Sequence, residues 1–271
     1  MIDIIKVIIL GIVEGITEFL PISSTGHLII TAALLDMNFS AALEGTFEIF
    51  IQLGAVIAVV VYYRRDFIQQ LCTVRTNPAV RRLWLGLIIG TFPLAVLGFL
   101  LRDYVKAVLF NPIVVAVSLI IGGVLFLIIE RRPVRTESLT TSVVEISTRQ
   151  AAAIGLIQAV ALIPGVSRSA MSIFGGLFAG LDRQTATKFS FYLAIPTLGG
   201  ATLVDLVLSM KDINGSDLIY LAIGALVSGI VAWFVIGWLL RFITRSNFIP
   251  FGYYRIAAGV IVLLLTSASL L

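Results

Sequence analysis

Charged residues, cysteine and histidine are all scarce in this sequence. Asp, Glu, Lys and Arg make up only 13% of its 271 residues, whereas 59% are apolar, and the mean hydropathy is +1.08. This composition excludes an ordinary soluble globular protein and indicates an integral membrane protein. A single cysteine, Cys72, excludes an intramolecular disulfide.

Long apolar runs take up most of the chain. Six of them are long enough, or nearly so, to cross a bilayer core that takes about 20 helical residues: 47–63, 84–101, 107–129, 189–209, 218–240 and 250–271. Two further apolar regions, 4–35 and 151–181, are interrupted by Pro-Ser or Pro-Gly sequences. We therefore predict one all-α polytopic membrane domain with six transmembrane helices and two broken, re-entrant helix pairs.

The basic residues are distributed unevenly between these runs. Segments 64–83, 130–150 and 241–249 hold eleven of them, whereas segments 102–106 and 210–217 hold three. By the positive-inside rule the first set is cytoplasmic, so both chain ends are expected outside. Because the basic residues lie in short segments between spans, the net charge of +4 does not indicate nucleic-acid binding.

The two halves of the chain resemble each other. A shift of 144 residues lays Gly11-Ile-Val-Glu14 on Gly155-Leu-Ile-Gln158, and Ser23-Ser-Thr-Gly26 on Ser167-Arg-Ser-Ala170. Three spans separate equivalent points, so the halves must have opposite orientation. We predict an inverted repeat, 1–135 and 148–271, an architecture that places binding sites near the membrane midplane and builds them from discontinuous helices.

The first interrupted region carries polar groups that are costly inside a bilayer. Glu14 and Glu18 are four residues apart, which places both carboxylates on one face of a helix. Pro21 breaks that helix, and a hydroxyl-rich turn, Ser23-Ser24-Thr25-Gly26, precedes a second helical run from His27 to Leu35. Ionisable groups at this depth are a functional-site hypothesis by default.

The second interrupted region repeats the turn and adds a cation. Its sequence Pro164-Gly-Val-Ser167-Arg168-Ser169 is followed by Ser172. Backbone N–H groups at a helix start attract anions, and the planar guanidinium of Arg168 matches phosphate oxygens in a bidentate way. Opposite this group, Glu14 and Glu18 can hold Mg²⁺ or Ca²⁺ together with phosphate oxygens. Glu48 and Gln52, one turn apart, are expected to line the same cavity.

Structural roles are open alternatives for the same residues. The glutamate pair could bond Arg168 or backbone amides, and His27 could be a structural histidine. Single hydroxyls between membrane helices are most often caps or interhelical bonds. The recurrence of the whole set in both halves favours a functional site that binds a phosphate-rich head group.

These motifs resemble the bacterial undecaprenyl-diphosphate phosphatase family of the bacitracin-resistance type. The resemblance rests on Glu14-x-x-x-Glu18, on Pro21-Ile-Ser-Ser-Thr-Gly-His27 and on Pro164-Gly-x-Ser-Arg-Ser169, and it extends over essentially the whole chain. One position departs from the family pattern, because Ser172 stands where the family usually has threonine. The hydroxyl is kept.

The resemblance implies an integral membrane hydrolase that converts undecaprenyl diphosphate to undecaprenyl phosphate and inorganic phosphate, in the bacterial inner membrane with its site facing the periplasm or outer leaflet. It implies roles in recycling the lipid carrier for the cell wall and in tolerance of bacitracin. By motif position, Glu14 and Glu18 form the acidic pair, Ser24 is the proposed nucleophile, His27 is the motif histidine, and Arg168 binds phosphate. A homodimer is possible.

Two questions stay open at the level of sequence. Ser24 could attack phosphorus with His27 or a glutamate as base, or water could attack directly. An ion-coupled transporter or a lipid-phosphate flippase is the rival class, because inverted repeats with broken helices also describe transporters.

Overall fold

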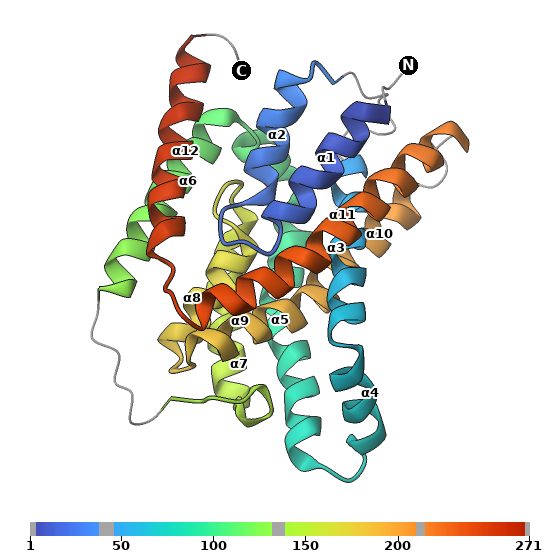
Figure 1. Ribbon diagram of the computed structural model, residues 1–271, viewed down its shortest axis with the longest axis vertical. Coiled ribbons are helices and arrows are strands. Elements are labelled where there is room, and N and C mark those ends of the chain that lie inside the picture. The colour runs from blue at the N-terminus through green and yellow to red at the C-terminus, as the bar shows by residue number, and fades with distance from the viewer. Residues whose placement is uncertain (1–3, 38–45, 132–138, 210–214, 269–271) are drawn as a thin grey trace.

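The computed structural model is a bundle of helices, and it describes residues 4–37, 46–131, 139–209 and 215–268 (Figure 1). The start of α1 and the end of α12 lie at one end of the molecule, and α4 lies at the other. This agrees with the predicted placement of the arginine-rich segments opposite the termini. Of the basic residues used for that prediction, Arg132, Arg135 and Lys211 lie outside the described residues.

The membrane spans confirm the predicted architecture, with shifted ends. Within the described residues, five helices or helix assemblies are long and apolar enough to cross a membrane: α5 (Pro78–Tyr104), α6 (Pro112–Glu130), α9 with α10 (Arg183–Ala194 and Gly200–Ser209), α11 (Gly215–Ile243) and α12 (Ile249–Ser267). The sixth is α3 (Thr46–Tyr62), which meets α4 (Arg64–Thr73) at a bend of 67°. Pro112 fits the first turn of α6, where its missing N–H costs nothing, so that span begins later than the predicted residue 107.

Both interrupted regions form helix pairs. The first consists of α1 (Ile4–Thr17) and α2 (Ser24–Leu34), and the second of α7 (Thr148–Gln158) and α8 (Arg168–Phe178). Each helix is too short to cross the bilayer alone, as predicted. The predicted start of α2 at His27 is wrong, because Ser23 caps the helix and Ser24 to Gly26 form its first turn.

Each helix pair packs against a span from the other half of the chain. Gly11 and Gly15 let α1 approach α11 so closely that a Cβ atom at either position would lie 2.8 Å or less from a backbone oxygen of α11. In the same way, a Cβ atom on Gly155 of α7 would lie 2.5 Å from the Gly90 oxygen of α5. This exchange agrees with the element order, in which a helix pair and three spans occur twice. The inverted repeat itself stays a prediction.

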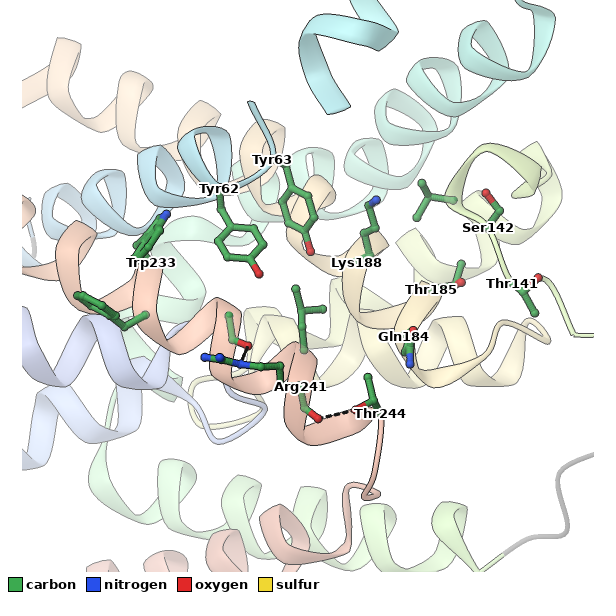
Figure 2. Close-up of a pocket in the computed structure, with 14 residues that line it drawn as sticks. Tyr62, Tyr63, Thr141, Ser142, Gln184, Thr185, Lys188, Trp233, Arg241 and Thr244 are labelled. Atoms are coloured by element: carbon green, nitrogen blue, oxygen red, sulfur yellow. Dashed lines mark hydrogen bonds between the residues drawn. The ribbon is translucent and has the colours of Figure 1, made fainter. Parts of the chain in front are cut away.

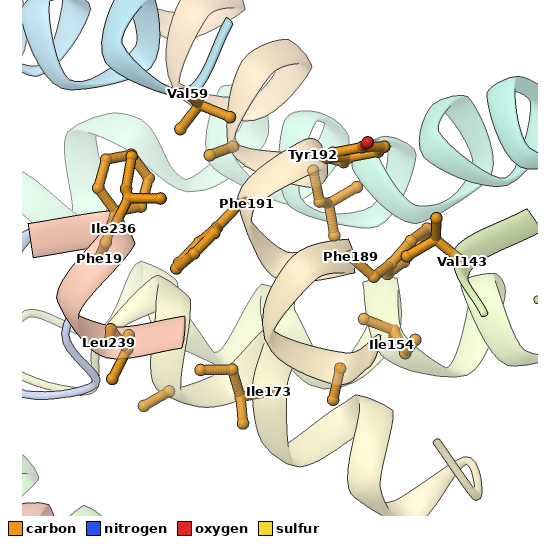
Figure 3. Packing of buried hydrophobic residues seen from close by; sticks show 14 of the residues in the cluster. Phe19, Val59, Val143, Ile154, Ile173, Phe189, Phe191, Tyr192, Ile236 and Leu239 are labelled. Carbon is orange, nitrogen blue, oxygen red and sulfur yellow. The ribbon is translucent and has the colours of Figure 1, made fainter. Parts of the chain in front are cut away.

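The hydrophobic core surrounds α9 and connects it to the turn between α1 and α2 (Figure 3). Phe189, Phe191 and Tyr192 are completely buried, and the Phe191 ring meets the Phe19 ring edge-on with centroids 5.1 Å apart. Between membrane helices, such close van der Waals packing stabilises the association. The core therefore fixes the segment Glu18–Ser23 relative to α9, next to the polar residues described below.

Candidate active site

The same backbone device begins α2 and α8. Ser23 and Ser167 adopt positive φ angles of 74° and 78°, a region that non-glycine residues rarely occupy. Each serine oxygen accepts a hydrogen bond from the backbone N–H three residues ahead, on Gly26 and Ala170. Strained backbone of this kind persists only where the surroundings enforce it, and it gathers at functional sites. Its occurrence at equivalent positions in both halves marks the two turns as a pair.

Glu18 joins the two turns directly. Its Oε2 accepts a hydrogen bond from the Ser24 hydroxyl at 2.5 Å, and its Oε1 lies 3.1 Å from a terminal nitrogen of Arg168. Both charged side chains are almost completely buried, with exposed fractions of 5% and 8%. A buried ion pair of this kind is costly to break, because the remaining charge has no partner. The predicted proximity of the acidic residues to Arg168 is therefore confirmed for Glu18.

Arg168 is oriented by two further contacts. Its other terminal nitrogen donates to the Ser190 carbonyl oxygen of α9 at 3.0 Å, and its guanidinium carbon lies 6.0 Å from the centre of the Phe19 ring. The Nε atom is buried and has no hydrogen-bond partner among the described residues. A buried donor left unsatisfied is destabilising, and an incoming phosphate oxygen would satisfy it.

A small cavity of about 160 Å³ lies between the two turns. The polar residues that line it are drawn from both helix pairs and from α3: Glu18, Ser23, Ser24, Thr25, Gln52, Ser167 and Arg168. Sites for whole drug-sized ligands are roughly 300–1,000 Å³, so this cavity suits a head group alone. Any long apolar tail has to lie outside it, against the spans or in lipid.

Glu14 lies one helical turn before Glu18. The Glu18 N–H donates to the Glu14 carbonyl at 2.9 Å, which extends the helical repeat and keeps both side chains on one face. Glu14 is fully buried, and neither carboxylate oxygen has a hydrogen-bond partner among the described residues. A buried carboxylate needs a cation, a donor or a proton.

The pair offers carboxylate oxygens, which are the ligands that Mg²⁺ and Ca²⁺ prefer. No group of three or more His, Cys, Asp or Glu side chains is placed to hold a metal in the described part of the chain. Mg²⁺ is commonly bound by one or two carboxylates, with substrate phosphates and water as its other ligands. Glu14 offers two free oxygens for this purpose, and Glu18 can share a remaining lone pair.

Six predicted site residues do not line the cavity, and the buried Glu14 is one of them. Gly26 packs against the Val115 side chain of α6, and Ser169 donates to the Leu20 carbonyl at 2.9 Å, which ties the second turn to the first. Ser172 bonds Ser190 of α9 at 2.6 Å. These three contacts are structural. Glu48 and His27 also lie outside the lining.

Both ring nitrogens of His27 have partners other than the Ser24 hydroxyl. Nδ1 lies 2.7 Å from the Ser23 carbonyl oxygen and Nε2 lies 2.6 Å from the Tyr254 hydroxyl of α12, and the two rings stack. In this structure the Ser24 hydroxyl donates its hydrogen bond to a Glu18 oxygen. Of the two bases left open by the sequence, the geometry favours Glu18.

Arg255 of α12 is a site residue that sequence reasoning missed. It is completely buried, and its guanidinium donates to five backbone carbonyl oxygens, on Pro21, Ser118, Leu119, Gly165 and Val166. Gly122 provides the space, since a Cβ atom there would collide with the guanidinium. Arg255 thus fastens both turns to α6. The signal in the sequence was a charged residue inside the apolar run 250–271.

The fold and this geometry define a class: a multi-pass membrane protein in which two re-entrant turns form a polar, cationic site for an anionic head group. The chain belongs to the family described as bacitracin resistance protein BacA, which matches residues 7–261. Relatives called undecaprenyl-diphosphatase include one from Deinococcus radiodurans, 49% identical over 97% of this chain and 96% of the relative. Another, from Enterococcus faecalis, is 40% identical over 98% of both chains.

Proposed function

We propose that this protein hydrolyses undecaprenyl diphosphate to undecaprenyl phosphate and inorganic phosphate. The observation that carries the proposal is the Ser24–Glu18–Arg168 constellation, which joins a hydroxyl, a base and a phosphate-binding cation from two different helix pairs. The names of the relatives support the same reading. The 160 Å³ cavity accepts the diphosphate, and the polyprenyl tail extends into lipid, which is why the site lies within the membrane.

Ser24 is the nucleophile in this proposal. Its hydroxyl proton passes to Glu18 Oε2 as the Ser24 oxygen bonds to the terminal phosphorus and the bond from that phosphorus to the bridging oxygen breaks. Undecaprenyl phosphate leaves as the anion. Glu18 then loses the proton to solvent and is a carboxylate again. Water attacks the phosphoserine and gives a proton to Glu18 as the bond from phosphorus to the Ser24 oxygen breaks. Glu18 returns this proton to the Ser24 oxygen, and inorganic phosphate leaves. Direct attack by a water molecule held by Glu18 is the competing route.

Arg168 and the two turns stabilise the charge that develops during phosphoryl transfer. Such reactions depend on positioning and electrostatic stabilisation more than on covalent chemistry from the protein. The Arg168 guanidinium, already fixed by Ser190 and Glu18, requires little reorganisation when the phosphate arrives. The N-terminal turns of α2 and α8, which begin at Ser24 and Arg168, offer further N–H groups to the anion.

Glu14, with Glu18, would hold the divalent cation, Mg²⁺ or Ca²⁺. When bound, such a cation neutralises phosphate oxygens and polarises the phosphorus. The unpartnered oxygens of Glu14 support this assignment.

The proposed setting is the bacterial inner membrane, with the site open to the periplasm or outer leaflet. In the inverted repeat that we predict, one helix pair enters the bilayer from each side. Helix α1 begins at the end away from the arginine-bearing helix α4. Recycling of the lipid carrier and tolerance of bacitracin follow from the reaction. A homodimer is compatible with it.

Phosphate release from purified protein tests the proposal against transport. We expect the detergent-solubilised protein to release one inorganic phosphate per undecaprenyl diphosphate when Mg²⁺ or Ca²⁺ is present, and EDTA to abolish the release. A transporter or flippase would leave the lipid chemically intact. Recovery of unchanged diphosphate lipid under all cation conditions would refute the hydrolase assignment.

A further inference from the structure

A second, larger cavity lies away from the candidate active site. Its volume is about 770 Å³, and it shares no lining residue with the smaller cavity. Figure 2 shows its walls, which come from the end of α3, the segment 141–143, the first turns of α9 and the last turns of α11. These are the element ends nearest to the arginine-rich segments, so the cavity belongs to the predicted cytoplasmic side.

One wall of this cavity is aromatic. Tyr62 of α3 and Trp233 of α11 meet edge-on with ring centroids 6.3 Å apart, and Phe234 beside them is 63% exposed. Trp and Tyr gather at the membrane–water interface, where their rings contact both lipid and head groups. The aromatic wall therefore places the cavity mouth at the boundary of the bilayer, next to acyl chains.

The opposite part of the cavity is cationic and hydroxyl-rich. Lys188 and Arg241 line it together with Thr141, Ser142, Gln184, Thr185 and Thr244, and no lining residue is acidic. Lys188 uses one N–H on Asp66 at 2.6 Å, whereas an ammonium has three. Arg241 uses Nε on the Gly237 carbonyl at 3.0 Å, and its terminal nitrogens have no hydrogen-bond partner among the described residues. Donors are thus in excess on this side.

We propose that this cavity is a second lipid-binding site, specific for a lipid with a phosphate head group in the cytoplasmic leaflet. The phosphate contacts Arg241 and Lys188, and the lipid tail lies along the aromatic wall of α3 and α11. Free phosphate lacks the tail that this wall accommodates, and a neutral lipid offers no anion to the Arg241 guanidinium or to the remaining N–H groups of Lys188. The inference does not require the proposed hydrolysis, since the two cavities are separate.

Tryptophan fluorescence tests this site through Trp233. In a Trp84→Phe/Trp238→Phe variant, Trp233 is the only tryptophan in the chain. An added Arg168→Ala change weakens phosphate binding at the candidate active site. In phosphatidylcholine nanodiscs, we expect a saturable fluorescence change on titration with polyprenyl phosphate or phosphatidylglycerol, and none with polyprenol or inorganic phosphate. Of polyprenyl phosphate and phosphatidylglycerol, the one with the lower half-saturating concentration is the lipid that this cavity prefers.

The matched variants are Arg241→Gln and Arg245→Gln. Arg241 lines the cavity, whereas Arg245, four residues later, does not. Loss of one charge-assisted contact is expected to raise the half-saturating lipid concentration about tenfold in Arg241→Gln, and Arg245→Gln should match the parent. Equal behaviour of the two variants, or equal responses to polyprenol and polyprenyl phosphate, would overturn the proposal. The fluorescence titration measures binding without turnover. A protein that does not hydrolyse the lipid would therefore still show saturable binding at this cavity.

Discussion

At the scale of single residues, the site depends on charges that are buried and shared. Glu18 accepts from Ser24 of its own helix pair and from Arg168 of the other, so one carboxylate sets the position of both groups. Glu14 is equally buried but has no hydrogen-bond partner among the described residues. Among the described residues, the Arg255 guanidinium bonds backbone carbonyls. In the function that we propose, Glu18 is the base, Glu14 is the cation ligand and Arg255 is the clamp.

Substitution of Glu14 tests the cation site. Glu14→Gln removes the charge but keeps the shape, so we expect the Mg²⁺ concentration for half-maximal phosphate release to rise about tenfold or more. Glu14→Asp keeps the charge and should lie between the parent and Glu14→Gln. The measurement is the rate of phosphate release against Mg²⁺ concentration at saturating lipid. An unchanged cation dependence in Glu14→Gln would show that the metal, if any, is bound elsewhere.

Substitution of Arg255 tests the clamp. Arg255→Lys keeps the buried charge but loses the guanidinium fork that reaches both turns. We expect kcat to fall about tenfold or more, because a small displacement of the turns misplaces the reacting groups. KM should change less, because Arg255 does not line the cavity. Steady-state kinetics separate the two parameters. A rise in KM with unchanged kcat would instead indicate that Arg255 contacts the substrate.

At the scale of elements, close helix packing positions the two turns. Gly54 of α3 faces α11 at a point where an added Cβ would collide with the Ala225 carbonyl. Membrane helices associate through van der Waals contact between small residues. This close approach therefore holds α3, which carries Gln52, against α11, which packs against α1.

Gly54→Ala should therefore destabilise the protein. We expect about 1–3 kcal/mol of destabilisation from overpacking, seen as a lower melting temperature in detergent. Gly200→Ala is the matched control, because a Cβ atom at Gly200 meets nothing within 4 Å and alanine favours the helix. Equal melting temperatures for the two variants would contradict the packing role.

The elements also show how far the sequence could be read. Hydropathy and the interrupting prolines located the six spans and both helix pairs, because length and polarity in a bilayer leave few alternatives. The N-caps at Ser23 and Ser167 depend on backbone angles that no periodicity reports, so the start of α2 was misplaced. Motif positions placed Glu18 and Arg168 together. They could not show that Ser169 and Ser172 face the neighbouring backbone and α9, or that His27 pairs with Tyr254, since these contacts depend on tertiary packing.

At the scale of the whole molecule, the arginine-bearing helix α4 lies at the end opposite the start of α1 and the end of α12. The single cysteine tests this topology, because Cys72 is exposed and lies on α4 at the arginine-rich end. In spheroplasts, Cys72 should react with a membrane-permeant maleimide and resist an impermeant one. In a Cys72→Ser background, Ser267→Cys at the end of α12 should react with both. Labelling of Cys72 by the impermeant reagent would reverse the assigned orientation.

The most direct test of the account compares one residue from each helix pair in a single assay. Initial rates of phosphate release from undecaprenyl diphosphate are measured for the parent, Ser24→Ala and Arg168→Ala. If both turns form one phosphate-transfer site, each variant loses about a hundredfold or more. A near-parental rate in Ser24→Ala would contradict the serine-nucleophile route, and a near-parental rate in Arg168→Ala would contradict the shared site itself.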